Sequence, residues 1–292
     1  MNLFGDMVYL WVDLGYRAFD NMYHEAIIFL TLSPINDASG YSSNVFANTW
    51  GYVTEWSKML LPFCFVILGI CLLLELAQAA AKVDTLRFET AIKVGVKLVL
   101  ARLCIDIVPT FLMACYQQVA VWITGLADLA DGFPEGGLEA IAKQYLKPYF
   151  DNLGFFAGLG MSIGTQIMAV AMMISGFIIY IMALARMVEI LVYVFISPIP
   201  CAMLPLSNGG DGFSRITGKF LRSFAAACLQ GLIMIVCLRL HGIIMMQILS
   251  NGLSNPEPNI LGLMTLLLLF SVALVMAVSK AGSWAKIALD AA

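Results

Sequence analysis

Charged residues are scarce in this chain of 292 residues: they form 12% of the sequence, whereas hydrophobic residues form 61%. So few polar groups do not cover the surface of a water-soluble globule, which excludes an ordinary soluble protein. No polar stretch exceeds about 57 residues, which leaves little room for an independent soluble domain. A lipid bilayer is therefore the expected solvent of most of the chain.

Motifs of catalysis and metal binding are lacking as well. His24 and His241 lie in unrelated segments, and the sequence contains no HExxH, GxSxG or glycine-rich phosphate loop. The seven cysteines form no CxxC pair and lie inside apolar segments, which favours packed thiols over a disulfide framework or a zinc site. We therefore predict no enzyme activity, no metal and no cofactor, and a bound phospholipid is compatible with this prediction.

Long apolar windows predict an all-α, polytopic membrane protein. A helical crossing needs about 20 predominantly apolar residues. Residues 1–57 are predicted to be extracellular or interfacial, and residues 58–292 to form the transmembrane domain. The predicted crossings are 59–80, 98–126, 155–185, 223–249 and 259–279.

The first 57 residues have the pattern of amphipathic helices. Leu3, Met7, Leu10 and Leu14 recur at helical spacing, and charged residues lie off that stripe. Such a helix is expected to lie at the membrane interface, because its charges interrupt it too often for a crossing. A second amphipathic stretch is expected at about residues 43–58.

The apolar run from 153 to 206 is too long for one crossing, because a single helix of that length would measure about 75 Å. We expect a first interruption at Arg186 and Glu189. A second is expected where prolines remove backbone donors. Residues 187–205 are therefore predicted to be a broken segment that re-enters the membrane or lies in the interface. The prolines that break it are Pro198, Pro200 and Pro205.

Charge asymmetry sets the expected topology. The segments 1–57, 127–152 and 250–258 carry three basic residues together, whereas 81–97, 206–222 and 280–292 carry nine. Because short cytoplasmic loops are rich in Lys and Arg, we predict five crossings with the N-terminus outside and the C-terminus in the cytoplasm. Six crossings rank second, since they place basic residues beside the acidic 127–152 loop. The basic residues of the predicted cytoplasmic partner loop are Arg215, Lys219 and Arg222.

Ionisable residues at membrane depth are candidates for function, because burying them in lipid is costly. Glu75 and Arg102 are expected at similar depth on two antiparallel crossings, where they would pair between helices. Arg102 and Asp106 are four residues apart and would pair along one helix face. The alternative is that these three residues line an aqueous path.

Four further charged or titratable residues lie in the later crossings. Arg186 and Glu189 share a helix face, where the arginine is expected to reach lipid headgroups rather than to gate a path. Arg239 and His241 are two residues apart and are expected to point in different directions. Close helix packing is predicted at the small-residue pair Gly160 and Gly164.

The order of several short passages resembles the TrbL family, the polytopic inner-membrane component of type IV secretion systems that corresponds to the sixth subunit of the VirB set. The versions in conjugative elements of Gram-positive bacteria are the most similar. The resemblance covers about residues 30–280 and includes five crossings with the N-terminus outside. The passages are Leu32-Ser33-Pro34, Asn44-Val45-Phe46, Leu74-Glu75-Leu76, Arg186-Met187-Val188-Glu189, Ile196-Ser197-Pro198-Ile199-Pro200, Gly212-Phe213-Ser214 and Phe220-Leu221.

This resemblance implies a channel or assembly subunit that helps single-stranded DNA, with a bound relaxase, to cross the cytoplasmic membrane. Secretion ATPases, a small pilin-like membrane subunit and membrane lipid are the expected partners, and the DNA is a transient one. A homo-oligomeric ring would gather Arg102, Arg186 and Arg239 into a basic annulus. The competing interpretations are a secondary transporter of a small solute and a non-conducting scaffold for the ATPases.

Overall fold

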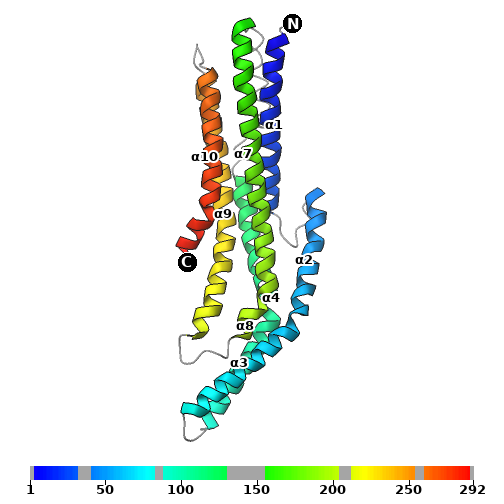
Figure 1. Ribbon diagram of the computed structural model, residues 1–292, viewed down its shortest axis with the longest axis vertical. Coiled ribbons are helices and arrows are strands. Elements are labelled where there is room, and N and C mark those ends of the chain that lie inside the picture. The colour runs from blue at the N-terminus through cyan, green and yellow to red at the C-terminus, as the bar shows by residue number, and fades with distance from the viewer. Residues whose placement is uncertain are drawn as a thin grey trace. The chain divides into compact units, whose positions relative to one another are not determined.

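The computed structural model describes residues 3–31, 41–82, 88–129, 155–203, 212–253 and 260–289, and within these ranges the chain is helical. This confirms the all-α prediction for the described residues. The helices are α1 (Leu3–Thr31), α2 (Tyr41–Met59), α3 (Leu61–Lys82), α4 (Phe88–Leu129), α7 (Phe155–Ile196), α8 (Pro198–Ala202), α9 (Gly212–Leu253) and α10 (Ile260–Ala288) (Figure 1).

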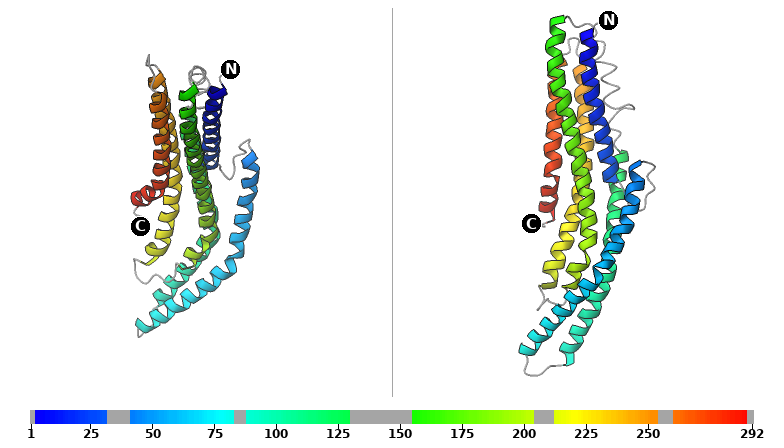
Figure 2. Two further views of the ribbon diagram at one scale, coloured as in Figure 1. Left: turned by 45° about the horizontal axis from the view of Figure 1, so that its top comes forward. Right: turned by 45° about the vertical axis from the view of Figure 1, so that its right-hand side comes forward.

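Four helices are long and apolar enough to cross a membrane, and the count rises to five if a bent pair forms one span. The bent pair joins Gly51–Met59 to Leu61–Ala77 at an angle of 41°. Both views of Figure 2 show this bend between α2 and α3. The chain is therefore a multi-pass membrane protein, and each predicted crossing falls on a described helix. The four spans outside this pair are Val94–Ala127, Met161–Ala202, Ile216–Ile248 and Gly262–Ala288.

The helix α7 differs from its prediction at Arg186 and Glu189, where it continues without interruption. At 1.5 Å per residue its 42 residues measure about 63 Å, twice the hydrocarbon thickness of a bilayer. Charged side chains do not interrupt a helix when they pair with each other along its surface. The break comes only at Ser197, where Pro198 begins α8 and lacks the backbone donor that would continue α7.

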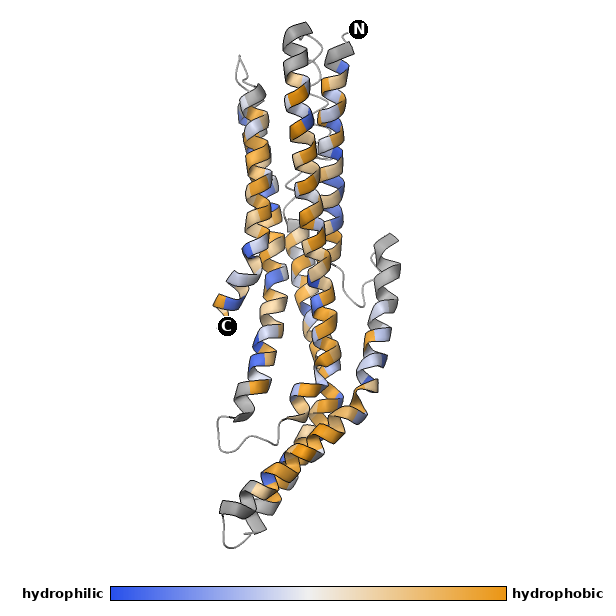
Figure 3. Cartoon of the chain, viewed as in Figure 1, coloured by the Kyte–Doolittle hydropathy of each residue, from blue (hydrophilic) through white to orange (hydrophobic). Residues whose placement is uncertain are grey.

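The described chain divides into two compact units. Unit 1 comprises residues 1–31, 122–185 and 231–282, so it contains α1, most of α10 and parts of α4, α7 and α9. Unit 2 comprises residues 32–121, 186–230 and 283–292, so it contains α2, α3, α8, most of α4, the remaining parts of α7 and α9, and the end of α10. Figure 3 shows that α3 and α10 are apolar along most of their described length, whereas α1 also carries hydrophilic residues.

In unit 1, α1 packs through a face other than the predicted apolar stripe. Val8, Val12, Tyr16, Phe19 and Tyr23 are buried at the helical spacing of four, four, three and four residues. The stripe residues Met7, Leu10 and Leu14 are instead exposed. The larger aromatic side chains bury more apolar area than the leucines do, so they decide which face packs inward. The interfacial position of α1 stays a prediction.

The contact between α1 and α7 in unit 1 is unusually close. A Cβ atom built on Gly15 would lie 2.7 Å from the Cα of Ala169, and one built on Gly176 would lie 3.2 Å from the Cα of Phe19. Small residues therefore bring these two backbones together. The predicted close packing at Gly164 is wrong for the described chain, because a Cβ there meets nothing within 4 Å. Gly160 lies outside the part whose surroundings are described.

In unit 2, α8 turns the chain onto the hairpin of α3 and α4. One buried cluster joins α3, α4 and α8 through Cys64, Leu68, Ala101, Ile105, Cys201 and Ala202. The hydroxyl of Thr217 at the start of α9 donates to the carbonyl of Pro200, at 3.2 Å. The proline break therefore lies beside the first turns of α9. The seven cysteines are free thiols.

Candidate functional site

The charged residues of the α3–α4 hairpin form two ion pairs. Lys97 donates to a carboxylate oxygen of Glu75, and Arg102 contacts Asp106 at 3.4 Å, one helical turn along α4. The guanidinium carbon of Arg102 also lies 4.2 Å from the ring centroid of Phe65 on α3, a cation–π contact. The Arg102–Asp106 pair was one of the two predicted arrangements.

The predicted pair between Glu75 and Arg102 is wrong, because the register of the hairpin decides the partner. The helices α3 and α4 run antiparallel, so a residue nearer the end of α3 meets one nearer the start of α4. Lys97 lies five residues closer than Arg102 to the start of α4. Its side chain therefore reaches the buried carboxylate of Glu75. In the sequence, Lys97 is one of the basic residues of the 81–97 segment, and nothing in the local pattern indicates it as the partner of Glu75.

Arg186 lies inside unit 2 rather than at a headgroup surface, which corrects its predicted role. The residue is 3% exposed, and its Nη1 donates to a carboxylate oxygen of Glu189 at 2.8 Å. Its Nε and Nη2 have no hydrogen-bond partner among the described residues. Tyr116 and Cys228, which belong to one apolar cluster of α2, α4, α7 and α9, are near enough to interact electrostatically. Glu189 is the exposed member of the pair.

In unit 1, the surroundings of Arg239 and His241 are provided by α1. The imidazole ring of His241 lies 6.0 Å from the ring of Phe19, and within the described chain neither of its nitrogens has a hydrogen-bond partner. The hydroxyl of Tyr23 donates to the backbone carbonyl of Leu238 at 2.7 Å. Burial raises the pKa of Tyr23, and the nearby charge of Arg239 opposes that rise. Both predicted residues of α9 therefore lie near the aromatic face of α1.

Phe19 and Tyr23 belong to this cluster but were not among the predicted site residues. Their spacing, together with Val8, Val12 and Tyr16, was readable as a helical face. The leucine stripe was instead interpreted as the apolar face of the helix, because leucine is more apolar than tyrosine. A buried aromatic hydroxyl needs an internal acceptor, which was the available signal.

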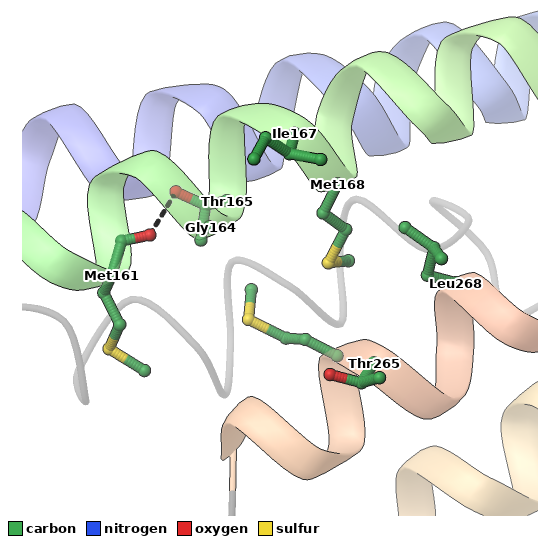
Figure 4. A pocket seen from close by; sticks show the side chains of 8 residues that line it. Met161, Gly164, Thr165, Ile167, Met168, Thr265 and Leu268 are labelled. Carbon is green, nitrogen blue, oxygen red and sulfur yellow. Dashed lines mark hydrogen bonds between the residues drawn. The ribbon is translucent and has the colours of Figure 1, made fainter.

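A groove between α7 and α10 in unit 1 has a volume of about 210 Å³ and an apolar lining (Figure 4). The hydroxyl of Thr165 donates to the carbonyl of Met161 at 3.0 Å, so this polar group serves its own helix. Gly164 widens the groove by leaving space open. Such a lining suits an acyl chain better than a charged solute. The groove is lined by Met161, Gly164, Thr165, Ile167, Met168, Met264, Thr265 and Leu268.

The residues of the predicted cytoplasmic loop lie on a helix, which corrects their setting. Arg215, Lys219 and Arg222 belong to the first turns of α9, and the last two are exposed. The side chain of Arg215 and all of Pro205 lie outside the described part. Among the residues that are described, no three His, Cys, Asp or Glu side chains come together as a metal site.

Comparison with known proteins identifies a family. Residues 39–198 match the family described as TrbL/VirB6 plasmid conjugal transfer like protein. The match runs from before α2 to the proline break, so it includes both hairpin ion pairs and the Arg186–Glu189 pair and leaves out Arg239 and His241. No curated protein and no solved structure matches the chain. Because more than half of the sequence matches, the chain belongs to the TrbL/VirB6 plasmid conjugal transfer-like family.

Proposed function

We propose that this protein is a membrane subunit of a conjugative type IV secretion system, where it helps single-stranded DNA with a bound relaxase to cross the cytoplasmic membrane. The observation that carries the proposal is the family match over residues 39–198, which covers α2, α3, α4 and α7. The apolar helices that contain the match support a place within the membrane rather than at its surface.

The charges favour an assembly role over an arginine-lined channel. A path for polyanionic DNA needs cations that are free to meet phosphates. Arg102 is instead paired with Asp106, and Arg186 is paired with Glu189 inside the helix bundle of unit 2. In a ring of such subunits, each of these arginines would be accompanied by its paired carboxylate. The pairs would therefore add no net positive charge to the ring. We therefore propose that the chain builds the membrane wall of the conduit, and that other subunits supply its basic lining.

The orientation that we propose has the N-terminus outside and the C-terminus in the cytoplasm. Lys219 and Arg222 are exposed near the start of α9, and Lys280 and Lys286 are exposed near the end of α10. Exposed lysines and arginines at helix ends are typical of the cytoplasmic side. The first turns of α9 then offer a basic surface to the secretion ATPases, and a small pilin-like membrane subunit is the other expected partner.

Conjugation assays test this proposal. Deleting the gene from a donor cell should abolish DNA transfer, and expressing the chain in trans should restore it. Placing an ultraviolet-activated cross-linking residue along the spans should capture transferring DNA rarely or not at all, if the chain is an assembly subunit. Strong DNA capture at Arg102 or Arg186 would favour a channel, and normal transfer without the chain would contradict the proposal. Solute uptake by liposomes that hold only this protein would favour a transporter.

A further inference from the structure

The exposed side of α4 in unit 2 carries an ion pair within an apolar stripe. The side chains of Arg102 and Asp106 are 59% and 44% exposed, and both lie inside the span Val94–Ala127. Exposed apolar residues continue the stripe on both sides of the pair. These residues are Ile92, Val96, Val99, Leu103, Ile107 and Phe111.

No single solvent suits this stripe. If the hydrocarbon of the bilayer covers the pair, an exposed guanidinium and an exposed carboxylate lie in lipid, where charged groups are strongly disfavoured. If the bilayer ends before the pair, the apolar residues from Ile92 to Leu103 lie in water. In either position, part of the stripe is in the wrong solvent, so another protein surface is needed to cover it.

The stripe has the charge pattern of a surface that can pair with itself. It carries one cation and one anion on the same face of the helix, one turn apart, so the arginine of one copy meets the aspartate of another. Phe65 holds the guanidinium of Arg102 at the surface. The adjoining part of α4 is also grooved, and Gly95 leaves space in which a neighbouring helix can approach closely.

We propose that α4 packs against α4 of a neighbouring copy of this chain, and that Arg102 of one copy pairs with Asp106 of the next. The same patch of each copy then meets across a two-fold axis, as in an isologous dimer. The inference deepens the proposed function and rests on it, because it assigns a surface through which two copies in the conduit wall pair. Each copy contributes one positive and one negative charge to this axis, so the contact is neutral at this level.

Charge reversal in two differently tagged chains tests the pairing. Arg102→Asp gives a stripe with two acids, and Asp106→Arg gives a stripe with two bases. Each variant expressed alone should lose oligomer by about tenfold or more, because like charges then face each other. When the two variants are expressed together, the acidic chain should co-purify with the basic one at the wild-type level. A pair confined to a single chain would show no such rescue.

The chain offers a matched control pair on α1. Arg17 and Asp13 are also four residues apart and lie 3.2 Å from each other. Reversing the charge of Arg17, whose side chain is 52% exposed, should leave the oligomer unchanged, whereas Asp13 is only 17% exposed and is kept. If the α1 variant loses as much oligomer as the α4 variants, general damage explains the result and the proposal fails.

Cysteine cross-linking gives a second test that does not depend on charge. Leu103→Cys should form a disulfide-linked dimer above the wild-type background on mild oxidation in membranes. The control Ile167→Cys on α7, at a position that is also exposed, should not. An oligomer that forms without cross-linking through position 103, or cross-linking of position 103 to a different protein, would overturn the proposal.

The outcomes separate this inference from the proposed function. If charge mixing restores the oligomer but DNA transfer does not need the chain, the α4 interface stands and the conjugative role fails. If transfer needs the chain but mixing never restores the oligomer, the interface is wrong and the conjugative role stands.

Discussion

The close approach of α1 to α7 predicts that alanine substitutions at three glycines will change the stability of the protein to different extents. An alanine at Gly15 would place its Cβ 2.7 Å from the backbone Cα of Ala169, which has no flexible end to move away. An alanine at Gly176 would place its Cβ 3.2 Å from the Cα of Phe19, and one at Gly164 would meet open space. The expected order of stability after substitution is therefore Gly164→Ala, then Gly176→Ala, then Gly15→Ala.

The magnitudes follow from two opposing effects. Replacing a mid-helix glycine by alanine stabilises a helix by about 0.5–1 kcal/mol, which is the whole effect expected at Gly164. Overpacking costs about 1–3 kcal/mol, so Gly15→Ala should have a net cost of roughly 1–2 kcal/mol. At about 2–4 °C per kcal/mol for a chain of this size class, the melting temperature should fall by roughly 2–8 °C.

Thermal unfolding of the purified protein in detergent measures these shifts, with circular dichroism for total helix and tryptophan fluorescence as a second probe. Trp11 lies on α1, so detachment of that helix should change its emission. Equal melting temperatures for Gly15→Ala and Gly164→Ala would refute the packing of α1 on α7. That result would instead favour the prediction from the leucine stripe, in which α1 lies at the membrane interface and does not pack on α7.

The ion pairs and the buried tyrosine lead to further predictions. Glu75→Gln and Lys97→Met should be coupled in a double-mutant cycle by about 1 kcal/mol or less, because Lys97 is partly exposed; zero coupling would contradict the pair. Glu189→Gln should destabilise more than Arg186→Met, since the first leaves a buried guanidinium uncompensated and the second removes it; the reverse order of melting temperatures would contradict the burial. Tyr23→Phe should cost about 1 kcal/mol by losing the bond to Leu238. Burial raises the pKa of Tyr23, so stability should fall as pH rises past about 10, and Tyr23→Phe should weaken that fall in alkaline melting curves.

The membrane class, the helical spans and the position of the main break could be predicted from the sequence. Each depends on local properties: the length of an apolar run, and the missing donor of Pro198. The family could also be recognised, because the order of short passages along the chain is a one-dimensional property. The Arg102–Asp106 and Arg186–Glu189 pairs could be predicted as well, since three or four residues along a helix always bring side chains together.

Contacts between helices were decided only by the tertiary structure. The register of the α3–α4 hairpin makes Lys97, rather than Arg102, the partner of Glu75. Packing selects the aromatic face of α1 over its leucines and places Arg186 inside a bundle rather than at a headgroup. A sequence states which residues share a helix face, but the partner of that face depends on how far one helix slides and turns against another. That choice is made by the summed fit of many side chains, so it appears only when the helices are packed.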